Sequence, residues 1–281
     1  LKDNLGQAYA YRAWCYLDLA RLYEPKDNVE APVPSNIVEL TVPIVDEKTT
    51  IDDCKQNPRA TRSEIYQFIL DDLKRAEENL NPAVTTFSQP TMMMVYGLYA
   101  RTYLELGYER SGYNKDMFAK AAEYARMVID QSGKTPLTKE QWTNPTTGFN
   151  SASSNNAWVW GLALSAENLN NLLTYTSHIS SEASWGYAAY AQFGASQILY
   201  DAIPETDFRK LSWLGPDKDE WTSGKYRFAG SDADMMAFLN GQGRPAAKPY
   251  MSLKFRPAQG ECNDFNVGNA IDYCLMRIEE M

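Results

Sequence analysis

Histidine is nearly absent from this chain: His178 is the single one among 281 residues. A Ser-His-Asp or Cys-His catalytic arrangement would have to use it, yet no nucleophile motif lies near it in sequence. We therefore interpret His178 as a solvated loop histidine. A histidine-rich metal site is excluded by the same count, and no GxxxxGK phosphate loop is present.

Positive charge, membrane-length apolar runs and cysteine pairs are lacking as well. The formal net charge is -9 and no basic stripe is present, which argues against a nucleic-acid partner. No apolar run is long enough to span a bilayer. Cys15, Cys54, Cys262 and Cys274 form no CxxC motif, so neither a zinc knuckle nor a dense disulfide framework is indicated. We expect free thiols, with a pairing of Cys54 or Cys262 left open.

No cofactor is indicated. Scattered aspartates and asparagines could hold a structural calcium ion, but no loop supports one, because Asp232-Ala233-Asp234 is too short for an EF-hand. Paired carboxylates of the kind used in glycoside hydrolysis stay open. The 36 acidic residues offer many pairs, and their separations are invisible in the sequence.

Three consecutive helical patterns fill residues 61–133. The first has a single apolar stripe and begins with Thr61 and Glu64, a capping-box pair. The second, over 91–106, is apolar nearly all round, so we expect it to lie centrally and to end at Gly107. The third has an alanine-rich face, and Asn114 is its expected N-cap. These patterns predict a tetratricopeptide-like packing layer.

An earlier helical pattern covers residues 5–23 and repeats this logic. Residues 13–19 and 100–106 share the pattern A-x-x-Y-L-[DE]-L, which suits helix pairs that stack in an irregular solenoid. Two unrelated core helices of similar composition remain the alternative. The predicted fold class is mainly α, a tetratricopeptide-like array with a loop-rich insertion that carries a few short strands.

The organisation predicted from these patterns is one domain over 1–281, truncated at both ends. Its helical layer is 1–133, with an extended, proline-punctuated excursion over 24–60, and 134–270 is a loop-rich ligand-binding region. Residues 158–160 are expected to form a strand and 254–256 a second one, whereas 275–281 looks helical. Because residue 1 already lies next to a mature helix pattern, we interpret the chain as an interior piece. Missing targeting signals therefore say nothing about location.

Aromatic residues make up 12% of the chain, and they gather among amides in the loop-rich region. Sugar rings offer C–H faces that pack on indole and phenol rings, while their hydroxyls need amide and carboxylate partners. The candidate ligand-binding residues supply both kinds of group: Trp185, Tyr187, Asn168, Asn171, Tyr175, Trp213 and Trp221. Each tryptophan could instead be buried in this region's own small core. A local basic pocket of Lys254, Arg256 and Arg244 could admit an anionic glycan.

The chain resembles the SusD/RagB family, the surface glycan-binding lipoproteins of Bacteroidetes. Residues 11–19 resemble the family's early R-A-x-x-Y-x-x-L helix, and 62–73 its E-x-Y-x-F-I-x-x-D-L segment. Further similar landmarks follow in family order: A-R-x-Y-L at 100–104, a helix at 121–129, D-x-R at 207–209 and D-x-x-L-x-R at 272–277. Two departures are an extension over 109–115 and the absence of the family's lipid-bearing N-terminal cysteine and C-terminal third.

The resemblance implies a glycan-binding protein, not an enzyme, on the outward face of the cell outer membrane. It implies a helical face that docks on a TonB-dependent, SusC-like transporter, and membrane contact only through an N-terminal lipid that this chain does not contain. It carries over no binding residue, because the family's sugar contacts lie in variable loops. A helical-repeat adaptor that binds protein is the alternative function, and a glycoside hydrolase is a third.

Overall fold

The computed structural model describes residues 1–26, 32–165, 167 and 174–281. The chain divides into two compact units, which are described separately. The helical unit comprises Leu1–Gly133 with Glu280–Met281, and the loop-rich unit comprises Lys134–Glu279. The mainly helical fold class with a few short strands is confirmed. Among the described residues, no helix combines the length and apolar character needed to cross a bilayer.

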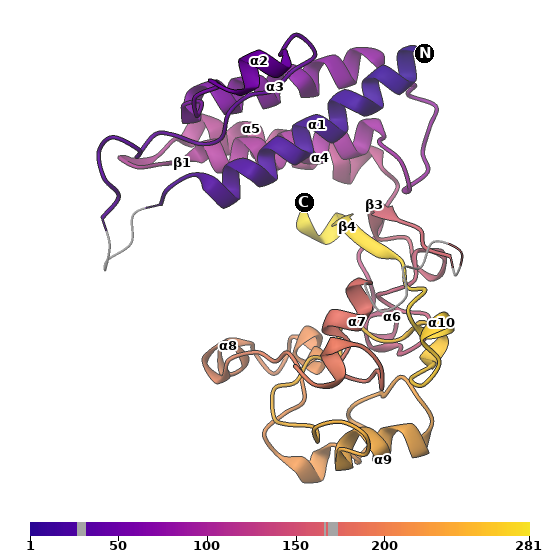
Figure 1. Cartoon of the computed structure of the whole chain (residues 1–281). Helices are drawn as coiled ribbons and strands as arrows, with labels where there is room; N and C mark the ends of the chain where they lie inside the picture. The colour runs from indigo at the N-terminus through magenta and orange to yellow at the C-terminus, as the bar shows by residue number, and fades with distance from the viewer. Residues whose placement is uncertain (27–31, 166, 168–173) are drawn as a thin grey trace. The chain divides into compact units, whose positions relative to one another are not determined.

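Four long helices form the helical unit and lie side by side (Figure 1). They are α1 (Lys2–Tyr23), α3 (Arg62–Asn79), α4 (Met92–Gly107) and α5 (Lys115–Gln131). Helix α1 packs on α3, α3 on α4, and α4 on α5. The central α4 buries residues on several sides, which explains its nearly continuous apolar sequence.

The predicted helix boundaries are confirmed at their caps. Thr61 and Glu64 form the capping box of α3, in which each side chain accepts the other residue's backbone N–H. The Asn114 side chain accepts from the Met117 amide and begins α5. Helix α4 ends at Gly107, where a Cβ atom would overlap the Phe118 ring of α5. Glycine therefore lets α4 and α5 approach closely at this point.

Shorter elements connect these helices. The short helix α2 (Ile51–Cys54) lies within the 24–60 excursion and has its own capping box. An antiparallel hairpin of β1 (Tyr108–Glu109) and β2 (Gly112–Tyr113) joins α4 to α5. Residues 109–115, an extension at the sequence level, therefore belong mostly to this hairpin.

A buried ion pair joins α1 to α3. The Arg12 guanidinium donates from Nε and Nη2 to both carboxylate oxygens of Asp72, at 2.6 and 2.7 Å, and Asp72 is fully buried. Its Nη1 donates to Glu47 in the excursion at 2.8 Å. The Tyr16 hydroxyl also bonds the backbone of Val45. One arginine on α1 thus fixes α3 and the excursion together.

In the part of the loop-rich unit that the structure describes, one antiparallel pair of strands occurs, β3 (Trp158–Leu162) and β4 (Tyr273–Arg277). In their register Trp158 faces Arg277 and Leu162 faces Tyr273. The predicted strand over 158–160 is confirmed. The helix expected over 275–281 is wrong: pairing with β3 makes the first part a strand, and only Ile278–Glu280 forms a 3-10 turn (η7).

Short helices and 3-10 turns make up the remaining regular structure of the described part of this unit. The α-helices are α6 (Lys139–Thr143), α7 (Tyr175–Ile179), α8 (Gln197–Ala202), α9 (Asp232–Asn240) and α10 (Phe265–Gly268). The 3-10 turns are η1 (Ala152–Ser154), η3 (Tyr187–Ala189), η4 (Phe208–Ser212), η5 (Lys218–Glu220) and η6 (Ala258–Gly260). The strand expected over 254–256 is wrong, because Met251 and Ser252 make the isolated bridges there instead.

The apolar core of the loop-rich unit lies around Leu214, Phe238 and Leu253, with Trp221 buried among them. The four cysteines, all of which the structure describes, form no disulfide, so the pairing left open for Cys54 and Cys262 is not formed. Asp232 and Asp234 belong to α9, and the Asp234 carboxylate caps that helix through Ser231. No group of three or more His, Cys, Asp or Glu side chains suited to a metal ion occurs among the described residues.

Replacing Arg12 by leucine tests the buried pair. In the variant, Asp72 stays buried, and Arg75 is the one cationic side chain among the described residues that still forms an ion pair with it. The distance from Arg75 Nη1 to Asp72 Oδ1 is 4.0 Å. We expect the free energy of unfolding to fall by about 3 kcal/mol, measured by urea denaturation. The matched control is Lys55→Leu, which removes the exposed Lys55–Asp52 pair and should cost less than about 1 kcal/mol. Equal losses would contradict the role given to Arg12.

Candidate functional site

Three exposed rings form an aromatic platform in the loop-rich unit: Tyr175 and His178 on α7, and Tyr187 on η3. The His178 and Tyr187 rings stack with centroids 5.2 Å apart and planes within 10°. Tyr187 is 60% exposed, Tyr175 is 45% exposed, and His178 is exposed as well. Tyr175 and His178 are three residues apart, so they share one side of their helix. Flat ring surface therefore faces solvent from two neighbouring elements.

Buried hydrogen bonds hold the platform in place. The Thr174 side chain caps α7 by accepting from the Ser177 amide, and its hydroxyl bonds Asn269 Oδ1 at 2.9 Å. The Trp185 indole Nε1–H donates to that same oxygen at 2.9 Å. Asn269 is fully buried. One buried amide therefore connects the start of α7 to the segment that leads into Tyr187.

Close packing fixes the spacing between α7 and η3. A Cβ atom on Gly186 would lie 2.6 Å from the Ser177 side chain, and Gly186 has a left-handed backbone with φ of 72°. Glycine is needed there for both reasons. The Tyr175 amide donates to the Tyr273 hydroxyl at 2.7 Å, and the two rings meet edge to face. The exposed rings thus stand on a rigid base, which limits the entropy lost on binding.

Some of the candidate ligand-binding residues predicted from the sequence are exposed, and others are buried in the fold. Tyr175 and Tyr187 are exposed, whereas Trp185 is 8% exposed, and a Cβ at Gly268 would overlap its ring. Trp221 is 4% exposed in the apolar core, where its Nε1–H donates to the Gly215 carbonyl. Trp213 is half-buried and bridges Ser252. Asn168 and Asn171 lie outside the described residues.

His178 is the platform residue that was not among the ligand-binding residues predicted from the sequence. Taken alone it looked like a solvated loop histidine, and the structure does leave it exposed, but on a helix and stacked on Tyr187. The available signal was its spacing of three residues from Tyr175. That spacing carries meaning only once a helix is known to begin at Tyr175, and a helix this short has no sequence period of its own.

The basic pocket expected from Lys254, Arg256 and Arg244 does not form an anion site. Arg256 and Arg244 are each 7% exposed, and both bind Glu182: its carboxylate lies 3.2 Å from Arg256 Nε, and its backbone oxygen accepts from Arg244. Burial raises the pKa of Glu182 and lowers the pKa of both arginines, and the attraction between the opposite charges opposes these shifts. These charges are used within the fold.

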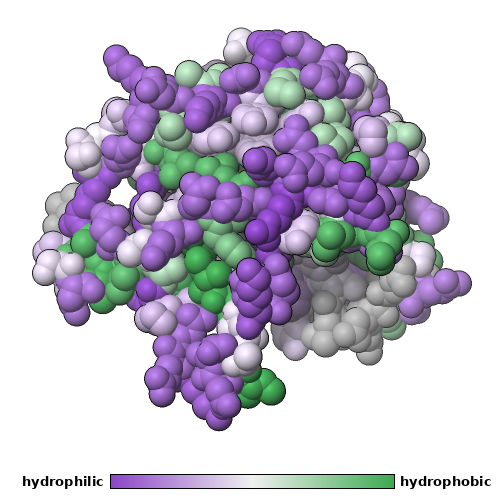
Figure 2. Space-filling view, turned by 90° about the horizontal axis from the view of Figure 1, so that it is seen from above, coloured by the Kyte–Doolittle hydropathy of each residue, from purple (hydrophilic) through white to green (hydrophobic). Residues whose placement is uncertain are grey.

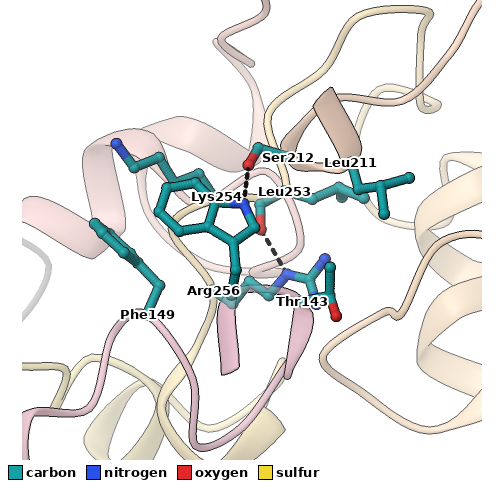
Figure 3. Close-up of a pocket in the computed structure, with 8 residues that line it drawn as sticks. Thr143, Phe149, Leu211, Ser212, Leu253, Lys254 and Arg256 are labelled. Atoms are coloured by element: carbon teal, nitrogen blue, oxygen red, sulfur yellow. Dashed lines mark hydrogen bonds between the residues drawn. The ribbon is translucent and has the colours of Figure 1, made fainter. Parts of the chain in front are cut away.

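Lys254 lies in a small pocket beside the Phe149 and Trp142 rings (Figure 3). The Trp142 Nε1–H donates to Ser212 Oγ at 2.9 Å, and Arg256 Nε–H donates to the Leu253 carbonyl. Burial and the nearby Arg277 lower the pKa of Lys254. The pocket has a volume of about 10 Å³, which is room for one water molecule and not for a sugar.

Nucleophilic chemistry finds little support at Cys262. Burial raises the pKa of its thiol to about 12, so the reactive thiolate is scarce near neutral pH. His178 stacks on a tyrosine ring 5.2 Å away. The described part of the unit thus presents exposed aromatic faces and a buried thiol.

Comparison with known proteins agrees with this architecture. Residues 1–104 match the SusD-like_3 family model, described as starch-binding associating with outer membrane. Over 98% of its length the chain superposes on 48% of a SusD-like carbohydrate-binding protein from Bacteroides vulgatus ATCC 8482, with a TM-score of 0.66 and 22% identity. The family model covers residues 1–104, and the solved structures share the fold of this chain at 22% identity or less.

Two further solved structures show the extent of this SusD-like fold. A SusD superfamily protein from Bacteroides thetaiotaomicron VPI-5482 matches 99% of the chain with a TM-score of 0.64, at 17% identity and over 52% of its own length. A structure described as containing xylogluco-oligosaccharide matches 99% of the chain, with a TM-score of 0.62, 16% identity and 52% of its own length. The chain thus spans about half the length of these proteins. No curated protein sequence matches it.

Two substitutions test whether Trp185 stabilises the fold while Tyr187 is an exposed surface residue. Trp185→Ala removes a buried ring and its bond to Asn269, so we expect the free energy of unfolding to fall by about 3–5 kcal/mol. Tyr187→Ala truncates an exposed ring and should change it by about 0.5 kcal/mol. Thermal unfolding of both variants measures the difference. A Trp185→Ala protein as stable as Tyr187→Ala would contradict the supporting role.

Proposed function

We propose that this SusD-like protein binds oligo- or polysaccharide at the outer surface of the cell and presents it to a TonB-dependent transporter. The observation that carries the proposal is the aromatic platform. Its rings are exposed, and the segments that carry them are held by buried hydrogen bonds from Thr174 and Trp185 to Asn269. C–H faces of sugar rings pack on such surfaces, and preorganised rings lose little entropy when they bind.

Within this proposal the predicted residues take different roles. Tyr187, Tyr175 and His178 contact the glycan, and Trp185 positions Tyr187 through Asn269 without contacting ligand. Asn168 and Asn171 stay proposed polar partners, as the sequence suggested. Trp221 and Trp213 stabilise the unit, since the first is in the core and the second bridges Ser252. The neighbour that contains a xylogluco-oligosaccharide makes neutral plant glycans sensible first probes.

The transporter is proposed to contact the helical unit. Exposed apolar side chains gather where α1 and α4 end, and the ion pair between Arg21 and Glu105 holds these two ends together at 2.8 Å. The exposed residues there are Leu22, Tyr23, Leu104, Tyr108 and Tyr113. The face of the molecule shown in Figure 2 is mostly hydrophilic, with apolar side chains in separate patches. An apolar patch with a polar rim is typical of a protein contact.

Affinity electrophoresis against soluble polysaccharides, with xyloglucan and starch among them, tests glycan binding. We expect one or more glycans to retard the native protein, and Tyr187→Ala to weaken that binding about tenfold, as loss of an aromatic anchor does. Tyr23→Ala is the matched control, because Tyr23 is 57% exposed on the helical unit. Equal retardation of all three proteins would remove the platform as the site.

The same samples distinguish the alternative functions. A glycan-binding protein leaves the bound polysaccharide intact, whereas release of new reducing ends would identify a glycoside hydrolase. Failure of every polysaccharide to retard the native protein would favour the helical-repeat adaptor, whose ligand is protein.

A charge placed in the apolar patch tests the transporter contact. Leu22 is 75% exposed, so Leu22→Asp should leave thermal stability nearly unchanged. We expect it to reduce co-purification of a SusC-like transporter with the full-length protein while glycan retardation is retained. Tyr187→Ala should show the reverse pattern. A Leu22→Asp protein that co-purifies the transporter as well as the native protein would contradict this placement.

A further inference from the structure

A polar pocket of about 250 Å³ lies in the loop-rich unit, apart from the platform residues. Residues of the 144–153 segment, of η6 and of the segment just before β4 line it. Its polar lining residues include Asn144, Asn150, Ser151, Ser153, Gln259 and Asp272. This volume is about twenty-five times that of the pocket beside Lys254, because 250 Å³ compares with 10 Å³. It is large enough for several water molecules or for part of one sugar ring.

The chemistry of this pocket is neutral to acidic. Of the described residues that line it, Asp272 alone is charged, and no cationic side chain contributes. The Asp272 carboxylate accepts from the Ala152 and Leu164 amides, one on each oxygen, at 3.2 and 3.1 Å. Each carboxylate oxygen keeps a further lone pair to accept from a ligand hydroxyl. An anionic ligand would meet this carboxylate without a cation to offset it.

Gln259 occupies a backbone conformation that its residue type disfavours. Its φ of 55° and ψ of 13°, followed by a φ of 72° at Gly260, form the two central positions of a tight turn closed by the Glu261 amide and the Ala258 carbonyl. This matches a type I′ turn, in which glycine, asparagine and aspartate are favoured. Glutamine there costs folding free energy, and such strain clusters at ligand sites.

The other left-handed non-glycine residue of the described chain, Tyr250, has a structural reason for its conformation. Its amide donates to the Leu214 carbonyl, its carbonyl accepts from the Ala195 amide, and its ring packs on Tyr200. The Gln259 side chain is exposed and makes no hydrogen bond with any residue that the structure describes. Its amide is therefore free to donate and accept at the pocket.

We propose that this pocket is a second saccharide subsite, specific for an uncharged, hydroxyl-rich sugar residue. The Gln259 amide and the Asp272 carboxylate would bind its hydroxyls, with the hydroxyls of Ser151 and Ser153 and the amides of Asn144 and Asn150 around them. The proposal rests on the proposed function and adds the ligand class. Asp272 lines the pocket, and the next residue, Tyr273, packs against the platform residue Tyr175. The subsite therefore adjoins the platform along the chain.

Gln259→Gly tests the subsite, because it removes the amide and relieves the backbone. The neutral oligosaccharide that retards the native protein is titrated calorimetrically into native, Gln259→Gly and Tyr187→Ala proteins. We expect Gln259→Gly to bind about two- to tenfold more weakly, the effect of one lost hydrogen bond, while its Tm is unchanged or a few degrees higher. Gln259→Asn, which keeps an amide and tolerates the left-handed backbone, should lose less.

A second variant and a charged probe complete the test. Ala270→Leu places a larger apolar side chain in the pocket wall and should weaken binding without any change at the turn. Polygalacturonate, as an anionic probe, should not bind through the pocket, so an affinity for it that Gln259→Gly reduces would overturn the ligand class. Native affinity in both pocket variants, with loss in Tyr187→Ala, would overturn the subsite and leave the proposed function standing. If no glycan binds the native protein, both proposals fail.

Discussion

The helical unit depends on the buried pair between Arg12 and Asp72. The two residues come from α1 and α3, and each belongs to a segment that resembles a landmark of the SusD/RagB family. A carboxylate that is fully buried can stay charged only with such a partner. The same guanidinium binds Glu47, so the proline-punctuated excursion is fixed to the helices by the interaction that joins them.

The loop-rich unit is organised differently, because its described helices are short and supply little packing of their own. Buried polar groups do the positioning: Asn269 joins Thr174 to Trp185, and Glu182 joins Arg256, Arg244 and the Ala229 amide. Such networks specify one geometry strongly, since a buried group left unbound is costly. This explains how loops can present exposed rings on a rigid base.

The two surfaces proposed for glycan binding complement each other chemically. The platform offers ring faces, which contact the apolar side of a sugar and tolerate different sugars. The pocket beside Asp272 offers amides, hydroxyls and a carboxylate. Hydrogen bonds from these groups depend on the orientation of each sugar hydroxyl, so the pocket can discriminate between sugars. Strain at Gln259 is consistent with this division, because a costly conformation persists where the position of one side chain matters.

The sequence by itself determined the long helices, their caps and the landmarks that resemble the SusD/RagB family. The apolar period of a long helix, and its capping residue such as Thr61 or Asn114, can be recognised in consecutive residues of the sequence. Only the tertiary structure decided that Tyr273–Arg277 pairs as a strand with β3, that Trp185 supports the platform from a buried position and that His178 stacks on Tyr187. These outcomes depend on partners far away in sequence, such as Asn269, and local residue patterns carry no information about such distant contacts.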